Sequence, residues 1–216
     1  MRLTQEAIDT QKQLFIDLIN SIERDFDKKR LIDWLENKSD FFTAPASSKN
    51  HCAFKGGLCM HSLNVFYTLE KLAQTFLPEN YPEKKEEDKR NNIKYNKDTL
   101  KIVALLHDIS KANYYEKYKR NVKDNNGNWV QVEEYKTKEN RFIYGNDEQT
   151  AEFMVSTFIP LTVEEKVALL HKSGGKAFDS TQTYIPIIFE SYDLATLLHC
   201  ADMLSCYIIE KDYDYE

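Results

Sequence analysis

The chain has 216 residues, of which 42% are apolar, 12% aromatic and 30% charged, so it can bury a sizeable core and is not globally disordered. Its formal net charge of −6 comes from charges mixed along the chain, which disfavours an extended nucleic acid as a partner. No apolar run approaches the ~18 residues of a membrane-spanning helix and no secretory leader is recognisable, so we expect a cytoplasmic protein with no membrane partner. The cysteines form no C-x-x-C pair, and we expect reduced thiols at Cys52, Cys59, Cys200 and Cys206.

The first half of the chain is predicted to be helical. Apolar residues recur at helical spacing over residues 4–24, 28–36 and 58–76, with a loop and Gly56-Gly57 before the third segment. The charged segment 78–98 is predicted to be a solvated loop. The run "VALLHDISK" that follows it predicts a further helix, which carries His107 and Asp108.

The second half changes its periodicity once and then returns to helices. Residues 115–139 alternate around Asn126-Gly127, which predicts an inserted two-stranded β-hairpin. Helices are then predicted over about 147–158, 162–171 and 187–210. We therefore expect a mainly α fold, a helical bundle with an inserted β-hairpin, forming a single domain over residues 1–216.

A cluster of histidine and aspartate residues is the strongest chemical signal. A lone histidine in an apolar helix is usually a hydrogen-bonded core residue, but Asp202 also lies in an apolar helix, where a buried carboxylate needs a cation or donor. His107 and Asp108 diverge by roughly 100° on a helix, so one helix cannot surround a cation with them. If neighbouring helices present His61 and Asp202, two imidazoles and two carboxylates can converge. His199, three residues before Asp202, lies on the same helix face.

Four ordered blocks of the sequence resemble a known family. They are "SDFFTAPASSKNHCAFKGGLCMHSLNV", "ALLHDISKANYYEKYKRNVK", "IPLTVEEKVALLHKSGG" and "YDLATLLHCADMLSCY". Their order is similar to that of HD-superfamily metal-dependent phosphohydrolases, both small bacterial and phage hydrolases and the HD domain of YhaM-type 3'-5' exoribonucleases. The resemblance covers about residues 30–208 and includes the hairpin.

The resemblance implies a metal centre and an HD-type fold. The family pattern H…HD…D maps onto His61, His107, Asp108 and Asp202 as ligands of one divalent cation. Family habit favours Mn or Fe, while nitrogen and oxygen donors also suit Co, Ni, Zn or Mg. Such a cation lowers the pKa of its water and polarises phosphate, so Asp108 counts as catalytic as well as a ligand.

Three further side chains are candidates for contact with the substrate. Lys111 would neutralise charge that develops on a phosphoryl oxygen. His51, just before the turn that leads to His61, would bind phosphate or donate a proton. His199 is a further candidate for substrate binding, because it shares a face with Asp202.

The chain departs from the family pattern in two places, the first of which affects a second metal. The family usually has Gly-His-Gly-Glu where this chain has Gly145-Asn146-Asp147-Glu148, so Asn146 replaces an expected ligand. His171, the other usual ligand of that metal, is present, and Asp147 is a partial substitute. Ser110 stands where a glycine is common.

These features predict an enzyme that hydrolyses a small phosphorylated substrate, a nucleotide or another phosphoester. Two alternatives remain open. The first is a catalytically weak or inactive HD module that binds metal or nucleotide in a regulatory role, which the loss of a ligand at Asn146 motivates. The second is a nuclease that acts on 3' ends. The sequence favours no particular oligomeric state.

Overall fold

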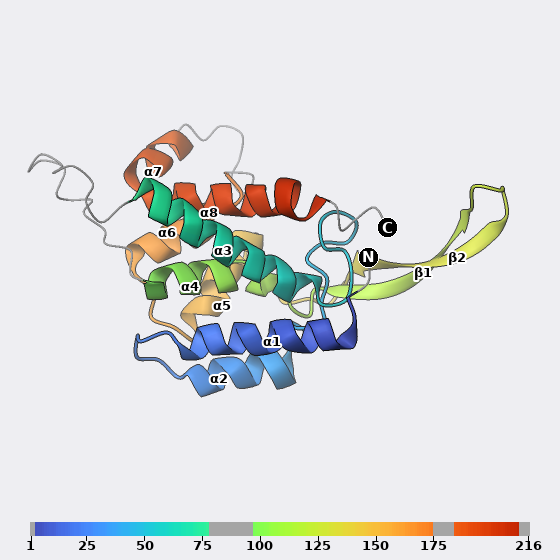
Figure 1. Cartoon of the computed structure of the whole chain (residues 1–216), viewed down its shortest axis with the longest axis horizontal. Helices are drawn as coiled ribbons and strands as arrows, with labels where there is room; N and C mark the ends of the chain where they lie inside the picture. The colour runs from blue at the N-terminus through green and yellow to red at the C-terminus, as the bar shows by residue number, and fades with distance from the viewer. Residues whose placement is uncertain (1–2, 78–96, 175–183, 212–216) are drawn as a thin grey trace, which may run out of the picture.

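The computed structural model describes residues 3–77, 97–174 and 184–211. Within these ranges the chain is mainly helical, with eight α-helices and one two-stranded antiparallel sheet (Figure 1). The predicted fold class is confirmed at this level. The predicted charged loop 78–98 falls almost entirely outside the described residues. None of the described helices is both long enough and apolar enough to cross a bilayer.

The N-terminal helices cover one side of the core. Helix α1 (Gln5–Asn20) begins where the Thr4 hydroxyl accepts a hydrogen bond from the Ala7 amide. Helix α2 (Lys28–Asp33) continues into a π-helical turn, η1 (Trp34–Lys38). The predicted first helix, 4–24, is too long at its C-terminal end. Ile22 lies beyond the helix but is only 1% exposed. The chain stays buried after its last helical turn, so the apolar pattern continues there and predicts too long a helix.

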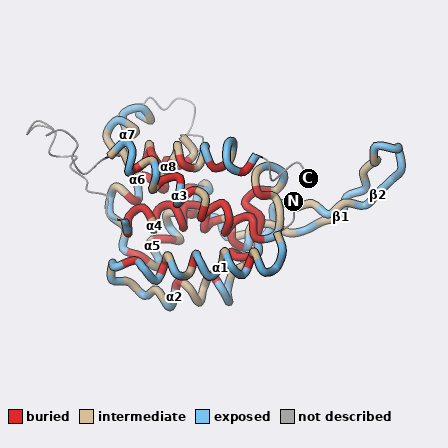
Figure 2. The backbone as a smooth tube through the Cα atoms, viewed as in Figure 1, coloured by how far each residue is buried: buried red, intermediate tan, exposed pale blue. Residues whose placement is uncertain are grey.

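Helices α3 (Gly57–Phe76) and α4 (Lys97–Leu106) form the centre of the bundle. They lie between α1 on one side and α8 (Asp193–Leu204) on the other (Figure 1). Every residue from Ile102 to Leu106 is fully buried, as the continuous buried trace of α4 shows (Figure 2). Polar residues that directly follow α4 are therefore delivered into the core rather than to solvent.

The inserted hairpin projects from the helical bundle. Strands β1 (Tyr115–Lys123) and β2 (Trp129–Thr137) pair antiparallel, from Tyr115 opposite Thr137 to Lys123 opposite Trp129. The turn between them places Gly127 at φ +81°, which glycine adopts without a steric penalty. The hairpin prediction is confirmed, and Figure 1 shows the ribbon extending away from the helices.

The C-terminal half returns to helices. Helices α5 (Asp147–Ser156) and α6 (Val163–His171) match their predicted ranges closely. The single helix predicted over 187–210 is wrong, because the chain forms α7 (Ile185–Ser191), α8 and a π-helical turn, η4 (Ser205–Ile209). Tyr192 separates α7 from α8 with non-helical dihedrals, φ −130° and ψ 88°, and its side chain packs against the core.

Candidate metal centre

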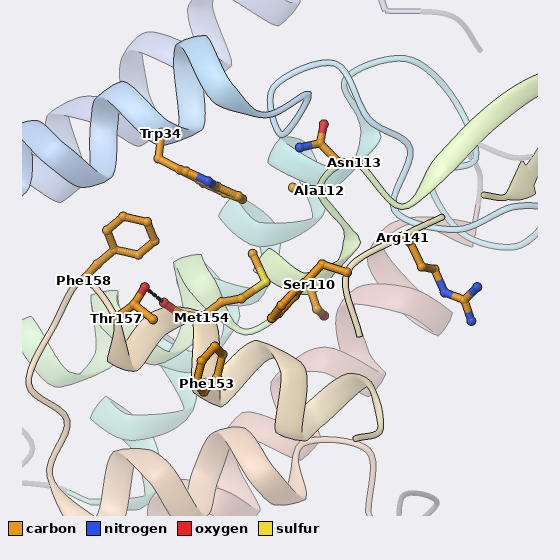
Figure 3. Close-up of a pocket in the computed structure, with 10 residues that line it drawn as sticks. Trp34, Ser110, Ala112, Asn113, Arg141, Phe153, Met154, Thr157 and Phe158 are labelled. Carbon is orange, nitrogen blue, oxygen red and sulfur yellow. Dashed lines mark hydrogen bonds between the residues drawn. The ribbon is translucent and has the colours of Figure 1, made fainter. Parts of the chain in front are cut away.

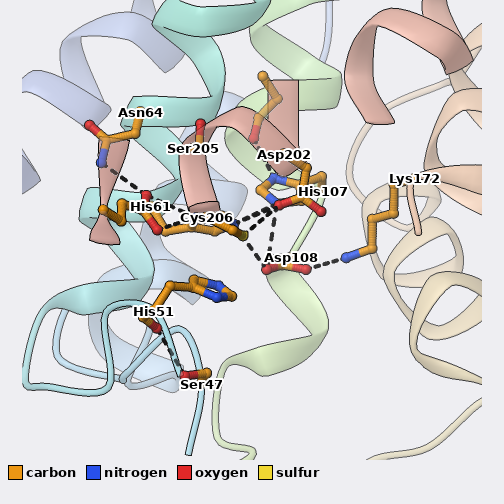
Figure 4. Close-up of polar contacts among 12 residues, drawn as sticks. Ser47, His51, His61, Asn64, His107, Asp108, Lys172, Asp202, Ser205 and Cys206 are labelled. Carbon is orange, nitrogen blue, oxygen red and sulfur yellow. Dashed lines mark hydrogen bonds and ion pairs between the residues drawn. The ribbon is translucent and has the colours of Figure 1, made fainter. Parts of the chain in front are cut away.

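His107 and Asp108 follow the end of α4 rather than lying within it. The helix ends at Leu106, and Asp108 has φ −110° and ψ 21°, so the geometry of two neighbours on a helix does not apply. The chain then makes a short 3₁₀ turn, η3 (Ile109–Lys111). Because the helix ends here, both side chains of the pair turn toward the same point inside the bundle (Figure 4).

The His107 ring is held in one tautomer. Its Nδ1 lies 2.7 Å from the Ala104 carbonyl oxygen, which can only accept a hydrogen bond, so Nδ1 carries the proton. Burial lowers the pKa of His107 to about 4, although the neighbouring Asp108 opposes that shift. The ring is therefore neutral at pH 7 and directs the lone pair of Nε2 toward the other site residues.

His61 from α3 and Asp202 from α8 complete the cluster. The Nε2 atom of His61 lies 3.2 Å from Nε2 of His107, 3.2 Å from Asp202 Oδ1 and 3.6 Å from Asp108 Oδ2. The Nε2 atom of His107 lies 3.5 Å from Asp108 Oδ2 and 4.0 Å from Asp202 Oδ1. Donor atoms about 2.0–2.2 Å from one cation lie roughly 3–4 Å apart. His61, His107 and Asp108 could hold a metal ion together, and Asp202 has this spacing toward the two imidazoles.

The pKa values of two cluster residues, His61 and Asp202, are strongly shifted. Burial disfavours a charged His61, but hydrogen bonds with Asp202 and Glu210 outweigh it and raise the pKa of His61 to about 9. Burial also opposes ionisation of Asp202, yet its hydrogen bond with His61 holds the pKa of this carboxyl below its usual range. Without a cation, a proton on His61 therefore balances part of the carboxylate charge.

Two lysines hold Asp108 from opposite sides. Lys111 Nζ lies 2.6 Å from Asp108 Oδ2, and the buried Lys172 contacts Oδ1. Their charges outweigh the cost of burial and keep the pKa of Asp108 well below its usual range. The contact of Lys172 was not predicted, because a lysine directly after a helix usually points to solvent.

Glu210 is the second residue that the sequence did not predict. Its carboxylate is fully buried and both of its oxygens lie within 3.1 Å of His61 Nδ1. Together with His51 and Cys206 it forms a second group of side chains around His61 with ligand-like spacing. Burial raises the pKa of the Cys206 thiol, which donates a hydrogen bond to Asp202 Oδ1, so Cys206 stays protonated and is a poor metal ligand.

His51, a predicted candidate for contact with the substrate, lies beside this cluster. Its ring centroid is 4.7 Å from that of His61, and its Nε2 atom is buried with no hydrogen-bond partner among the described residues. Burial lowers the pKa of His51 to about 4, with smaller contributions from His61 and Lys111. The imidazole is therefore neutral at pH 7.

The other predicted residues do not join the cluster. His199 stacks on Phe189 at a centroid distance of 5.6 Å, and its Nδ1 donates to the Lys172 carbonyl oxygen, so it supports the segment that carries Lys172. His171 donates from Nδ1 to the Val167 carbonyl oxygen, 2.8 Å away. The groups of histidine, cysteine, aspartate and glutamate with ligand-like spacing among the described residues contain neither His171 nor Asp147.

A mainly apolar cavity is lined in part by Ser110 of η3, the short turn that directly follows Asp108 of the candidate metal centre. It measures about 360 Å³ and is walled by Trp34, Met154, Phe153 and Phe158 (Figure 3). Ser110, at the position where the family commonly has glycine, lines it. The Ser110 hydroxyl is buried without a hydrogen-bond partner among the described residues.

Comparisons of the chain with protein-family models, with curated proteins and with solved structures find no match. The resemblance to HD-type hydrolases therefore stays a prediction from the four sequence blocks. The convergence of His61, His107, Asp108 and Asp202 is an independent geometric observation, since nothing in the periodicity of those blocks fixes where their helices meet.

Proposed function

We propose that this protein is an HD-type phosphohydrolase that uses one divalent cation to hydrolyse a nucleotide or another small phosphoester. One observation carries the proposal. His61, His107 and Asp108 lie with the spacing of metal ligands, and Asp202 Oδ1 from a third part of the chain lies 3.2 Å from His61 Nε2 and 4.0 Å from His107 Nε2. Their nitrogen and oxygen donors suit Mn or Fe, and also Co, Ni, Zn or Mg.

The residues around the centre have distinct tasks in this proposal. The bound cation would polarise a phosphoryl oxygen and acidify the attacking water. The side chain of Lys172 is only 5% exposed and forms a buried ion pair with Asp108, whereas the side chain of Lys111 is 21% exposed. Lys111 is thus placed to meet an incoming phosphate and to neutralise the charge that develops on it.

His51 binds rather than protonates the substrate in this scheme. A general acid must carry its proton near the working pH, and a pKa of about 4 leaves His51 neutral there. A neutral imidazole still donates one hydrogen bond. We therefore assign His51 to hydrogen bonding with the phosphate and revise the predicted role of proton donor.

The test combines metal binding with turnover. Purified protein is titrated with Mn²⁺ and then assayed for release of phosphate, pyrophosphate or triphosphate from a nucleotide panel. Asp202→Asn should weaken Mn²⁺ binding and turnover by at least about 100-fold, more than the 10–100-fold typical of residues outside the ligand shell. Bound Mn²⁺ without any product across the panel would contradict the enzyme proposal.

Asp98→Asn is the matched control. Asp98 is also a buried aspartate, but it accepts hydrogen bonds from the Glu23 and Arg24 amides, both at 2.9 Å, and is not in the cluster. This variant should lower thermal stability and leave Mn²⁺ affinity and turnover per folded molecule unchanged. An equal loss of metal binding in both variants would mean that Asp202 acts through the fold.

A regulatory module is the second candidate, and one observation favours it. Lys111 and Lys172 already compensate both oxygens of Asp108, so the cluster has an internal counter-charge without a metal ion. In that case nucleotide would bind tightly without turnover. The third candidate, a 3'-end nuclease, predicts shortening of a labelled oligonucleotide by the wild-type protein and not by Asp202→Asn.

A further inference from the structure

Glu210 occupies an unusual place for an acidic residue. It directly follows η4, and its amide donates to the Ser205 carbonyl oxygen at 2.9 Å, which closes the wide turn of a π-helix. The neighbouring Ile208 and Ile209 are exposed, whereas Glu210 is fully buried. A single π-helical turn re-aims the side chain that follows it, and such turns are frequent at functional sites.

The buried carboxylate has specific partners. Oε1 and Oε2 of Glu210 lie 3.0 and 3.1 Å from His61 Nδ1, and Asn64 donates to Oε1 from Nδ2 at 2.9 Å. Asn64 lies on α3, three residues after His61. One helix therefore supplies both the ring and the amide that orients its acceptor.

The contact fixes which nitrogen of His61 can bind a cation. An ionised carboxylate only accepts hydrogen bonds, so Nδ1 of His61 must carry a proton and Nε2 is left for the centre. The Ala104 carbonyl oxygen imposes the same tautomer on His107. Both imidazoles are thus held with Nε2 toward the two aspartates, one by a neutral backbone acceptor and one by a charged side chain.

We propose that Glu210 is a positioning residue for the metal centre, which holds His61 with Nδ1 protonated and makes Nε2 a stronger ligand, and that Asn64 orients Glu210. The inference rests on the proposed metal-dependent function. Carboxylate acceptors behind histidine ligands typically contribute 10–100-fold to metal affinity. Glu210 is then a partner of a ligand, not a ligand itself.

Calorimetric titration with Mn²⁺ tests the proposal. Glu210→Gln keeps an oxygen acceptor without the charge, and Glu210→Met keeps a similar length without an acceptor. We expect Mn²⁺ binding about 10-fold weaker in Glu210→Gln and about 100-fold weaker in Glu210→Met. Affinity within twofold of the wild type in both variants would overturn the proposal, as would a loss in Glu210→Gln as severe as that in Asp202→Asn.

Glu165→Gln is the matched control. Glu165 is another fully buried glutamate, but it pairs with Arg24 at 2.6 and 2.7 Å and has no place in the cluster. It should lose thermal stability at least as much as Glu210→Gln while keeping its Mn²⁺ affinity. If Glu165→Gln weakens Mn²⁺ binding equally, the effect of Glu210 is one of stability and the proposal fails.

A second readout does not depend on metal. The ¹⁵N chemical shifts of the His61 ring in the metal-free protein, recorded at a pH where the ring is neutral, report which nitrogen carries the proton. We expect Nδ1 in the wild type and Nε2, donating to Asp202, in Glu210→Met. An unchanged tautomer in Glu210→Met would refute the positioning role. If the wild type binds no Mn²⁺ but the His61 tautomer still differs between the wild type and Glu210→Met, only the proposed function is contradicted.

Discussion

Asn146 stands where the resembled family usually has a histidine, and its side chain serves a helix. Its Oδ1 accepts from the Gln149 amide at 2.8 Å, and Gln149 Oε1 accepts from the Asn146 amide at 3.0 Å. This reciprocal pair is a capping box at the start of α5. Asp147, the predicted substitute ligand, is exposed. The departure from the family pattern thus has a local structural role.

Asn146→Ala tests that role. Removing an N-cap side chain costs about 1 kcal/mol, so the free energy of unfolding should fall by that amount. Metal content per chain, measured by elemental analysis, and Mn²⁺ affinity should not change. Asn146→Ser, which can still cap the helix, should retain most of the stability. A lower metal content in Asn146→Ala would instead identify Asn146 as a ligand.

Single residues also show what the sequence could and could not predict. His61, His107, Asp108 and Asp202 were selected from the sequence because each is a polar residue in or beside an apolar helical run and because the four blocks resemble the H…HD…D pattern. Glu210 was not, since it begins the acidic stretch "EKDYDYE", where carboxylates are normally solvated. The π-helical turn before Glu210 turns its carboxylate into the interior. The contact of Lys172 with Asp108 likewise depends on how α6 packs, which helical periodicity does not encode.

At the scale of elements, helix ends position the site as much as helix faces do. Asp108 lies beyond the C-terminal end of α4, and Glu210 beyond that of η4. Periodicity predicts the faces of helices well but places their ends poorly, because termini are decided by tertiary contacts. The sequence accordingly predicted one helix over 187–210, whereas the chain breaks at Tyr192, whose side chain packs against the core.

The N-terminal end of α3 gives a testable case. A Cβ atom added at Gly57 would lie 2.0 Å from the Cys52 carbonyl oxygen, a backbone atom that cannot move freely. Gly57→Ala should therefore cost roughly 3 kcal/mol, the upper end for overpacking. Mn²⁺ affinity should fall as well, because His61 is four residues further along the same helix. Chemical denaturation and metal titration measure the two effects.

Gly127→Ala in the hairpin is the control for that prediction. Gly127 has φ +81°, but an added Cβ there meets nothing within 4 Å. The cost should be the left-handed backbone penalty of about 1 kcal/mol, confined to the hairpin turn. Equal losses of stability in the two variants would show that the close approach of Gly57 to Cys52 is not needed at the start of α3.

At the scale of the whole molecule, a cation bound at the candidate site should raise the free energy of unfolding. A ligand that binds only the folded state stabilises it by about 2.7 kcal/mol at a concentration 100-fold above its Kd. The four candidate ligands come from α3, the segment after α4, and α8, so a shared cation would join helices that are far apart in sequence. Mn²⁺ should raise the melting temperature of the wild type but not of Asp202→Asn, and a chelator should reverse the increase.

This stabilisation should depend on pH through His61. Its pKa is about 9 in the folded protein against an ordinary 6.5, so protonation stabilises the metal-free fold below about pH 6.5, and that contribution is lost as the pH rises through about 9. A cation competes with the proton on Nε2. Mn²⁺ affinity should therefore rise about tenfold from pH 7 to pH 8, with release of about one proton per ion, measured by calorimetry in buffers of different ionisation enthalpy. Affinity that does not change over this interval would show that His61 is already neutral, and that the carboxylates around it raise its pKa far less than their distances imply.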